Sequence, residues 1–513
     1  MKFVGLARTE TEVVNLSQTS PSGLKGIAGV IGVTEFGEPN KPKLIGSWIE
    51  YQRNFGGLLP DSQFPYLCKR ALDGGARLRI SPVGHYTDIA DPTTLEGAKA
   101  TGTLIDGADR AVINAVWTGE AGNKITVTTV DAANGVPDQV DMVIEVAGFA
   151  GEVDLTQRVY NIPSAPTAEE KSQLNAGLKL IQLGAITNLI PVATITLAGG
   201  ARDITDIVSQ DYIGDAASST GLHSFDNFPD IRYVAVPEKA MPAIDIAISE
   251  YVTLRKGTFG VVRTPVGIDG VTATDYRYGR GVYSHQAIDN WRMLMTFGGL
   301  KAVHPRTLEL EEITEIADML ALFTRKDSNN YEWITFAGPK RGKITNAQDV
   351  VYNLYSPARS LEAAQVDMAG INPVINHEAF GVVAWGNGTL HMADDLLKHA
   401  NVAALVLLLE KDLPRIIQTE LFEPNDIETW KGIYLRVKPY MEDIESNRGV
   451  WKWKYEGDQD IDNISEATVN EPANIDVGGY KFRLWIAPKV GMKYIGIEIG
   501  VTNSNVEFNL IQG

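Results

Sequence analysis

The fold is decided by a stretch in the second half of the chain, Ala369-Gly-Ile-Asn-Pro-Val-Ile-Asn-His-Glu-Ala-Phe-Gly-Val-Val-Ala-Trp-Gly-Asn-Gly-Thr-Leu390. Gly370 and Pro373 predict a turn at its start, because proline lacks an N–H and biases the residue before it toward extended backbone. Phe380–Trp385 is a short apolar run rich in β-branched and aromatic residues, which predicts a buried strand. Gly386-Asn-Gly388 then predicts a second turn.

A second stretch, Leu421-Phe-Glu-Pro-Asn-Asp-Ile-Glu-Thr-Trp430, lies a short distance further on. Between the two, Asp394–Leu409 has Leu, Ala and Val at helical spacing, which predicts a well-buried helix. Asn425 followed three residues later by Glu428 approximates a capping box and predicts that a helix begins there. Neither stretch contains a nucleophile with its base or a set of metal ligands, so both are interpreted as scaffold.

Together the two stretches resemble the tail sheath proteins of contractile-tailed bacteriophages and related contractile injection machines. The matching residues are Gly370-Ile371-Asn372, Val383-Ala384-Trp385-Gly386, Thr389-Leu390 and Phe422-Glu423-Pro424-Asn425-Asp426 with Trp430. Many members of that family carry Ala-Arg before the Thr-Leu pair, where this chain has Asn387-Gly388. No role of that arginine is therefore carried over.

Length and composition set limits on the class of protein. The 513 residues are enough for two to four domains, and 44% hydrophobic with 21% charged residues is an ordinary globular profile. No segment approaches the roughly 20 apolar residues of a membrane span, and the start lacks the features of a secretory signal. We therefore expect synthesis and folding in the host cytoplasm. The net charge of −18 argues against a general nucleic-acid or anionic-membrane binder.

The order of apolar patterns predicts the fold class. We expect an α/β and α+β multidomain protein, with a central α/β sheath core, an inserted small antiparallel β domain and a C-terminal α+β domain, flanked by extended terminal arms. The expected ranges are 1–20 for the N-terminal arm, 21–100 for the N-terminal part of the core, 101–220 for the inserted β domain, 221–390 for the subtilisin-like α/β sheath domain, 391–500 for the C-terminal sheath domain and 501–513 for the C-terminal arm. The term subtilisin-like comes from the resemblance and describes fold, not activity.

Individual elements support that division. Buried strands are expected at Gly26–Val33, Ile231–Val236 and Phe259–Thr264, with a crossover helix at Ala240–Arg255. Strand and helix alternate there, so a mostly parallel sheet covered on both faces is expected. Further along we expect an amphipathic helix over Leu308–Phe323, a strand over Tyr331–Phe336, and late strands at Trp451–Tyr455, Lys481–Ile486 and Met492–Val501.

Motifs that suggest chemistry have plainer explanations. Cys68, the only cysteine, excludes an internal disulfide and is expected to be buried in a helix. Gly338-Pro-Lys-Arg-Gly-Lys343 is one residue short of a phosphate loop and lacks its Ser or Thr, so it predicts a basic turn after a strand. Asp275–Arg280 alternates aromatic residues with arginines, a pattern that can bind nucleic acid by stacking. In so acidic a chain it better suits a loop that makes protein–protein hydrogen bonds. We expect no catalytic, metal or cofactor site and no enzymatic activity.

The resemblance implies a mechanical function. Copies of the chain would stack in rings, six to a ring in that family, around an inner tube, and would contract to drive the tube through a cell envelope. The implied partners are other copies, the inner tail tube protein, and baseplate and tail terminator proteins, all in the tail of a virion. Two alternatives stay open: a subtilisin-like hydrolase with an active or degenerate site, and a non-contractile capsid or adhesin protein.

Two sets of residues are candidates for intersubunit contact. The first set lies in the terminal arms, where isolated strand-forming segments suit addition to a neighbour's sheet: Val4, Leu6, Val13, Val14, Leu16, Val501, Val506, Phe508 and Leu510. The second set is basic, and by resemblance the C-terminal block that carries it faces the tube: Lys411, Arg415, Lys431, Arg436 and Lys438. The alternative for the second set is that these side chains are only solvated.

Overall fold

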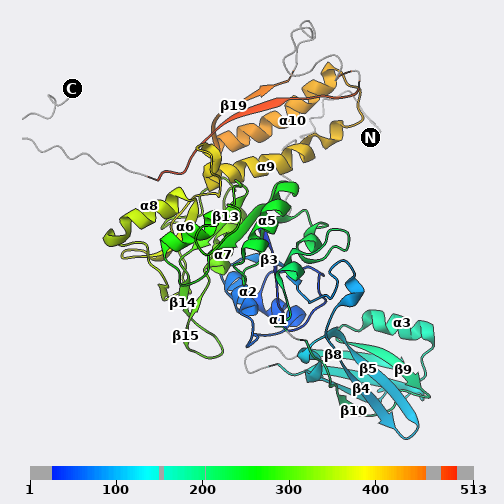
Figure 1. The fold of residues 1–513 in the computed structure, drawn as a ribbon. Coiled ribbons are helices and arrows are strands. Elements are labelled where there is room, and N and C mark those ends of the chain that lie inside the picture. Colours follow the sequence, from blue (N-terminus) through cyan, green and yellow to red (C-terminus); the bar gives the residue numbers. More distant parts are fainter. Residues whose placement is uncertain (1–25, 149–154, 203, 458–474, 476, 494–513) are drawn as a thin grey trace, which may run out of the picture.

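The computed structural model describes residues 26–148, 155–202, 204–457, 475 and 477–493 (Figure 1). The candidate arm residues of 1–20 and 501–513 lie outside the described residues, as does most of the expected strand Met492–Val501. Figure 1 shows three tiers: an α/β body in the middle, a β-rich unit below it, and two long helices with a small sheet above.

The body is built on an eight-stranded sheet with the order β18-β17-β13-β12-β11-β1-β3-β2. Neighbours from β17 to β3 are parallel, and the two outermost strands are antiparallel to theirs. The expected mostly parallel sheet is therefore present. Its strands are β1 Ile27–Gly32, β2 Lys43–Ile45, β3 Arg77–Pro82, β11 Ile231–Ala235, β12 Phe259–Arg263, β13 Met293–Phe297, β17 Ile371–His377 and β18 Gly381–Ala384.

Both faces of this sheet are buried, and alternate residues of each strand serve opposite faces. In β1, Ala28 and Val30 join one hydrophobic cluster, whereas Ile27 and Ile31 join another. The first cluster includes residues of α1 Trp48–Phe55, α2 Phe64–Asp73, α7 Ile316–Asn329 and the start of α9 Ala400–Ile417. The second includes residues of α4 Ser209–Ile213, α5 Pro242–Leu254, α6 Gly270–Tyr278 and α8 Ser360–Met368.

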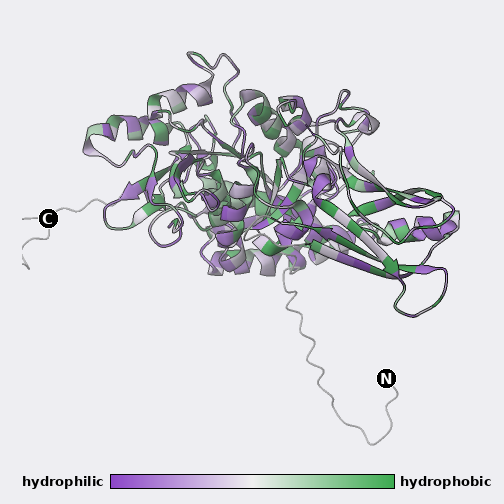
Figure 2. Ribbon diagram, turned by 90° about the horizontal axis from the view of Figure 1, so that it is seen from below, coloured by the Kyte–Doolittle hydropathy of each residue, from purple (hydrophilic) through white to green (hydrophobic). Residues whose placement is uncertain are grey.

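The lower unit interrupts the sheet, because the chain leaves it after β3 and returns at β11. It consists of a three-stranded sheet β4-β5-β9 and a four-stranded sheet β10-β6-β7-β8, both antiparallel, which share one hydrophobic cluster. Hydrophobic and hydrophilic residues alternate along these strands (Figure 2). The elements are β4 Lys99–Asp106, β5 Asp109–Thr118, β6 Ile125–Asp131, β7 Gln139–Val146, β8 Leu155–Pro163, α3 Ala168–Gly177, β9 Ile181–Thr187 and β10 Thr194–Thr196.

The upper tier, which we call the C-terminal lobe, contains α9, α10 Ile427–Ser446, β19 Val450–Glu456 and β20 Arg483–Pro488. The two strands pair antiparallel as a separate two-stranded sheet. Its hydrophobic cluster joins α9 to α10 and to the inner face of the sheet.

Two expected elements of the body differ from the structure. The helix expected over Leu308–Phe323 is present from Ile316 onward as α7, whereas Leu310–Ile313 in its first half is strand β15. Pairing of β15 with β14 Leu300–Val303, itself paired with β16 Asp349–Val350, overrides the helical spacing of the apolar residues.

The strand expected over Tyr331–Phe336 is an irregular segment. Its aromatic residues anchor a loop instead: Trp333 stacks on Tyr331 with ring centroids 4.8 Å apart, and its Nε1 donates to the carbonyl oxygen of Asn447 at 3.0 Å. The aromatic content that favoured a strand thus serves tertiary contacts.

The stretch that decided the fold largely has the structure expected of it. The turn expected at its start is present at Ala369-Gly370, where Gly370 has a φ of +71°, and strand β17 begins directly after it. Pro373 lies inside that strand rather than in the turn, and its carbonyl oxygen accepts a hydrogen bond from the Trp385 N–H at 2.8 Å. The helix expected over Asp394–Leu409 begins only at Ala400 and continues to Ile417, with Pro414 inside it. The expected strand at Phe380–Trp385 is present as β18.

Candidate assembly surfaces

The sheet of β19 and β20 has two open edges. The strands pair with each other over Glu456↔Arg483 to Val450↔Pro488, and neither has a second partner strand among the described residues. In an antiparallel pair every second residue directs its N–H and C=O away from the partner strand. Along each outer edge these main-chain groups have no partner strand among the described residues, and such an edge is a template for adding another strand.

Packing on α10 holds this small sheet in place, since an isolated two-stranded sheet is marginal in water. Trp453, Tyr455, Leu484 and Ile486 pack against the hydrophobic cluster of the C-terminal lobe. The Tyr455 hydroxyl lies 2.9 Å from the Tyr480 hydroxyl, and burial raises the pKa of Tyr455 above its usual range. The sheet is thus held on the C-terminal lobe, and neither of its edges has a further strand among the described residues.

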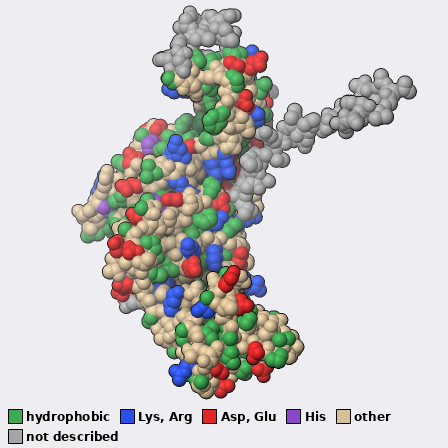
Figure 3. All heavy atoms as spheres, turned by 90° about the vertical axis from the view of Figure 1, so that its right-hand side faces the viewer, with side chains coloured by type: hydrophobic (Ala, Val, Ile, Leu, Met, Phe, Trp, Pro, Cys, Tyr) green, Lys and Arg blue, Asp and Glu red, His purple; other side chains and the backbone are tan. Residues whose placement is uncertain are grey.

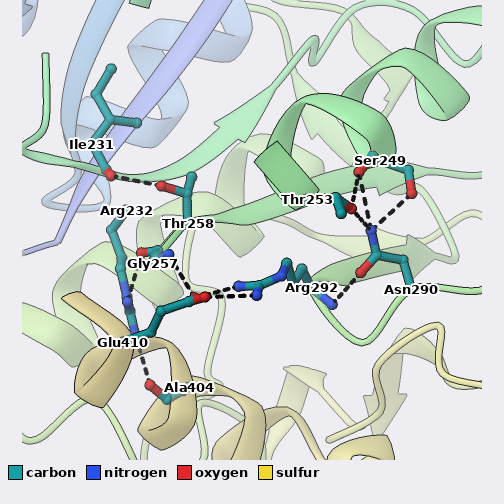
Figure 4. Close-up of polar contacts among 10 residues, drawn as sticks. All are labelled: Ile231, Arg232, Ser249, Thr253, Gly257, Thr258, Asn290, Arg292, Ala404 and Glu410. Carbon is teal, nitrogen blue, oxygen red and sulfur yellow. Dashed lines mark hydrogen bonds and ion pairs between the residues drawn. The ribbon is translucent and has the colours of Figure 1, made fainter. Parts of the chain in front are cut away.

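A polar joint fixes α9 on the body, and Figure 4 shows it. Arg232 of β11 donates to the carbonyl oxygen of Gly257 at 2.8 Å and to that of Ala404 at 2.7 Å. Glu410 of α9 accepts from both Nη atoms of Arg292, at 2.5 and 2.9 Å, and from the Gly257 N–H at 3.0 Å. A bidentate arginine–carboxylate pair of this kind is among the strongest and most directional polar contacts.

Electrostatics of the joint follow from its partial burial. Burial alone would raise the pKa of Glu410, but the hydrogen bonds from Arg292 and Gly257 outweigh it and hold the pKa below its ordinary value. Sequence reasoning missed these residues. The available signal was Arg232 itself, a charged residue inside the otherwise apolar strand Ile231–Ala235, because buried charges are retained only with partners.

The asparagines of the family-like stretch form a second joint. Asn372, fully buried, donates to the carbonyl oxygen of Gly388 at 2.9 Å and accepts from its N–H at 2.8 Å. Asn387 donates to the side chain of Asn401 on α9 at 2.8 Å, and Asn401 donates to the carbonyl oxygen of Lys489 at 2.9 Å. The turn after β18, the start of α9 and the end of β20 are therefore linked by side-chain amides.

The expected helix cap at Asn425 is wrong by one residue. Asp426 caps α10, accepting from the Thr429 N–H at 3.0 Å. Asn425 instead accepts from Trp430 Nε1 at 2.8 Å and donates to the carbonyl oxygen of Gly479 at 3.2 Å. Those contacts tie the start of α10 to the chain leading into β20, which explains why Asn and Trp occur together in the stretch.

The structure divides the five basic candidates into two groups. Lys411 and Arg415, one turn apart on α9, line a pocket against the end of α5. On α10, Lys431 is exposed, Arg436 pairs with Glu420 at 2.5 Å, and Lys438 lies 3.8 Å from Glu442. On the face shown in Figure 3, Lys and Arg side chains lie close together just below the uppermost lobe. The five do not form one continuous surface.

The side chains that suggested chemistry have structural roles. Cys68 is buried in α2, as expected, and burial raises the pKa of its thiol. In the turn after Gly338, Arg341 Nε donates to the carbonyl oxygen of Thr335 at 2.8 Å, and no strand precedes this turn. The loop expected at Asp275–Arg280 is the end of α6, with Arg277 only 1% exposed.

Three of the described histidines contact aspartates, and one of them, His391, contacts both Asp289 and Asp395. His85 contacts Asp211 at 2.9 Å and His223 contacts Asp226 at 3.2 Å, and neither pair has a serine hydroxyl as a third member in the described chain. Within the same residues, no group of three potential metal ligands occurs. The helices that the structure describes include none with the length and apolar character needed to cross a membrane.

Comparison with solved structures defines the class of fold. A sheath tail protein from Listeria innocua superposes with a TM-score of 0.59 at 13% identity, covering 91% of this chain and 96% of that one. A sheath tail protein from Desulfitobacterium hafniense gives 0.56 at 15% identity, covering 90% and 94%. The contracted helical sheath of the anti-feeding prophage gives 0.55 at 13% identity, covering 98% and 99%. The chain has the mixed α/β, multi-sheet fold of sheath proteins.

Sequence comparison points the same way. The tail sheath protein of Enterobacteria phage T4 is 23% identical over 261 residues, which is 49% of this chain and 37% of the relative. That of Vibrio phage KVP40 is 24% identical over 196 residues, 38% of this chain and 27% of the relative. The chain thus spans about a third of the length of these curated relatives, and no family model matches it. The predicted resemblance to contractile tail sheath proteins is confirmed.

Proposed function

We propose that the chain is the sheath subunit of a contractile tail. Copies stack as rings, six to a ring, around an inner tube, and contraction of the stack drives the tube through a target envelope. The observation that carries the proposal is the β19–β20 sheet, held rigidly on a body with the sheath fold and open at both edges among the described residues. The subunit then acts by assembly and without an enzymatic step.

In this proposal the two terminal arms, 1–20 and 501–513, are the added strands. Each arm of one copy pairs with an open edge of a neighbour's β19–β20 sheet, through main-chain hydrogen bonds worth about 0.5–1.5 kcal/mol each. Identical head-to-tail contacts of this kind generate open helical arrays. In this proposal the links run through the arms and not through the bodies, so the copies can swing as rigid bodies while every link stays closed.

The stiffness of each copy matters for the same reason. The joint of Arg232, Arg292 and Glu410 fixes α9 to the body, and the amide links of Asn387 and Asn401 fix it at its other end. A pull on the β19–β20 sheet therefore reaches the body with little internal yielding. Rigid-body motion of subunits, released from a metastable extended lattice, is then the source of the work.

We place the C-terminal lobe toward the inner tube and the antiparallel unit of β4–β10 outward, with baseplate and terminator proteins at the ends of the stack in the tail of a virion. Of the basic candidates on α10, Lys431 is the best suited to a tube contact, since it is exposed and has no ion pair among the described residues. Arg436 and Lys438 are partly neutralised by Glu420 and Glu442.

The test is to express the full chain alone and inspect it by negative-stain microscopy and sedimentation, beside a variant lacking residues 1–20 and 501–513. We expect striated hollow cylinders from the full chain, and small particles with unchanged circular dichroism from the truncated one. Cylinders formed equally well by both chains would refute strand addition by the arms. A full chain that stays monomeric and turns over a substrate would support the hydrolase alternative.

A further inference from the structure

The strongest feature outside the sheet edges is a pocket of about 610 Å³ between the end of α5 and the second half of α9. Four basic side chains line it, Arg255 and Lys256 after α5 and Lys411 and Arg415 on α9, against a single carboxylate, Asp226. We call it the cationic pocket. In a chain whose net charge is −18, such a local excess of positive charge is conspicuous.

None of these four cations forms an ion pair with a described carboxylate. Asp226 already accepts from the Tyr251 hydroxyl at 2.8 Å, and Arg255 donates to that hydroxyl and to main-chain carbonyl oxygens, which carry no charge. Lys256, Lys411 and Arg415 form no ion pair with any described residue. The nearby carboxylate of Glu410 belongs to the joint with Arg292.

A fifth cation, Arg232, acts on Lys411 and adds to the excess of positive charge. Arg232 is only 5% exposed, donates to two carbonyl oxygens and forms no ion pair with a described carboxylate. Burial, followed by the charges of Arg232 and Arg415, lowers the pKa of Lys411 to about 8, although Asp412 and Asp230 act in the opposite direction. An anion seated in the pocket would relieve this repulsion and raise the pKa of Lys411.

The mixed polar and apolar lining of the pocket favours a peptide over a small inorganic anion. Pro229, Tyr251 and Leu254 line it together with the cations, and Leu254 is 82% exposed. Acidic side chains interleaved with apolar ones would use both kinds of lining. The chain contains such a segment: residues 458–476 carry six Asp or Glu and no Lys or Arg, with Ile461 and Ile464 among the first acids.

We propose that the cationic pocket of one copy receives the acidic segment 458–476 of another copy. The segment connects β19 to β20, and Figure 1 shows that sheet above α10 and α9. The pocket lies where α9 meets the end of α5, and α5 lies below α9. A neighbour is therefore the better-placed donor. This contact rests on the proposed assembly into a sheath, and it adds a side-chain charge contact to the main-chain links of the arms.

Charge exchange tests the pairing. The pocket variant combines Lys411→Glu with Arg415→Glu, and the segment variant combines Asp458→Lys, Asp460→Lys and Asp462→Lys. We expect each to lose at least tenfold in sedimentable polymer at low salt, with unchanged circular dichroism. A chain carrying all five substitutions should recover to within twofold of the native level. Reversal of two exposed lysines of the lower unit, Lys99→Glu with Lys179→Glu, serves as the matched control and should have no effect.

Mixing distinguishes a contact between copies from one within a copy. In each variant the pocket and the segment carry charges of the same sign, so copies of one variant repel each other at this contact. The pocket of the pocket variant is acidic and the segment of the segment variant is basic, so an equimolar mixture should polymerise if the contact joins two copies. Recovery in the five-substitution chain without recovery in the mixture would overturn the assignment to a second copy. If the segment variant alone forms normal polymers, segment 458–476 is not the ligand of the pocket. The occupant of the pocket would then be the inner tube or another acidic partner.

A binding measurement separates this proposal from the sheath proposal. A labelled peptide of residues 457–477 should bind the segment variant and lose at least tenfold in affinity when Lys411→Glu and Arg415→Glu are added. Binding without any polymer from the native chain would refute the sheath function and retain the pocket contact. Polymers without peptide binding, or displacement of the peptide by 10 mM inorganic phosphate, would refute the pocket contact alone.

Discussion

Removing the carboxylate of Glu410 should loosen the C-terminal lobe from the body. In the native chain this carboxylate accepts two hydrogen bonds from Arg292 and one from the Gly257 N–H. The substitution Glu410→Gln keeps the shape but removes the charge, and it turns one acceptor into a donor that faces the donors of Arg292. The guanidinium is then left without its counter-charge, which is costly when the group is partly buried.

The size of the effect follows from the exposure of the pair. Breaking a fully buried ion pair by removing one partner costs about 3–5 kcal/mol. The side chains of Arg292 and Glu410 are 12% and 22% exposed, so solvent screening reduces the expected cost to about 2–3 kcal/mol. For a cooperative unit of a few hundred residues this corresponds to a fall in melting temperature of roughly 5–10 °C.

The assay is differential scanning calorimetry at pH 7.5, with Glu442→Gln as the matched control. Glu442 lies 3.8 Å from Lys438 and is 55% exposed, so its loss should cost about 0.5 kcal/mol or less. Because Glu410 has a lowered pKa, its contribution is present above the unfolded-state pKa and is lost as the pH falls through the folded pKa. The melting temperatures of Glu410→Gln and Glu442→Gln should therefore converge at acidic pH. Equal melting temperatures at pH 7.5 would refute the joint as a mechanical anchor.

Three further predictions concern the body. Burial raises the pKa of Asp245 to about 7, although the Tyr276 hydroxyl donates a hydrogen bond to it at 2.6 Å. The folded state therefore keeps a proton that the unfolded state has already lost, and native stability should fall as the pH rises from about 4 to 7. Asp245→Asn should therefore stabilise the chain by about 2–3 kcal/mol at pH 8 and not at pH 4, measured by urea unfolding. Gly370→Ala should lower the free energy of unfolding by at least 3 kcal/mol in the same assay, because φ is +71° and the new Cβ would lie 2.0 Å from the carbonyl oxygen of Thr389. Gly381 has nearly the same φ, +72°, but open space around it, so Gly381→Ala should cost only about 1–2 kcal/mol. The Cys68 thiol should react with a thiol reagent at the rate of unfolding, and fast labelling of the native chain would contradict its burial.

Local patterns predicted the parallel sheet well because its strands are short apolar runs buried on both faces. The segments Ile231–Ala235 and Phe259–Arg263 carry that pattern without interruption, and the crossover helix between them is amphipathic enough to be found. The expectation failed where long-range pairing competes with local spacing. Leu310–Ile313 forms a strand because it pairs with β14, and the residues of that segment do not by themselves indicate this pairing.

The candidate surfaces were only partly predictable for the same reason. The strands β19 and β20 were expected at Trp451–Tyr455 and Lys481–Ile486, close to their observed bounds. Whether their edges are open depends on which other strands lie beside them, and the local sequence does not contain that information. Lys411 and Arg415 were singled out as basic residues of one helix face, whereas their meeting with Arg255 and Lys256 required residues far apart in sequence to fold together. The joint at Glu410 brings together three separate elements, and in the sequence only Arg232 indicated that such a joint exists.

Amide hydrogen exchange of β19 and β20, compared between dispersed and polymerised full-length chain, tests strand addition most directly. In the dispersed chain the amides that point outward from the two-stranded sheet should exchange fast, while those paired across Glu456↔Arg483 to Val450↔Pro488 exchange slowly. Polymerisation should protect the outward amides on both edges by at least a hundredfold and leave the paired ones nearly unchanged. Outward amides that exchange equally fast in polymer and dispersed chain would contradict the account.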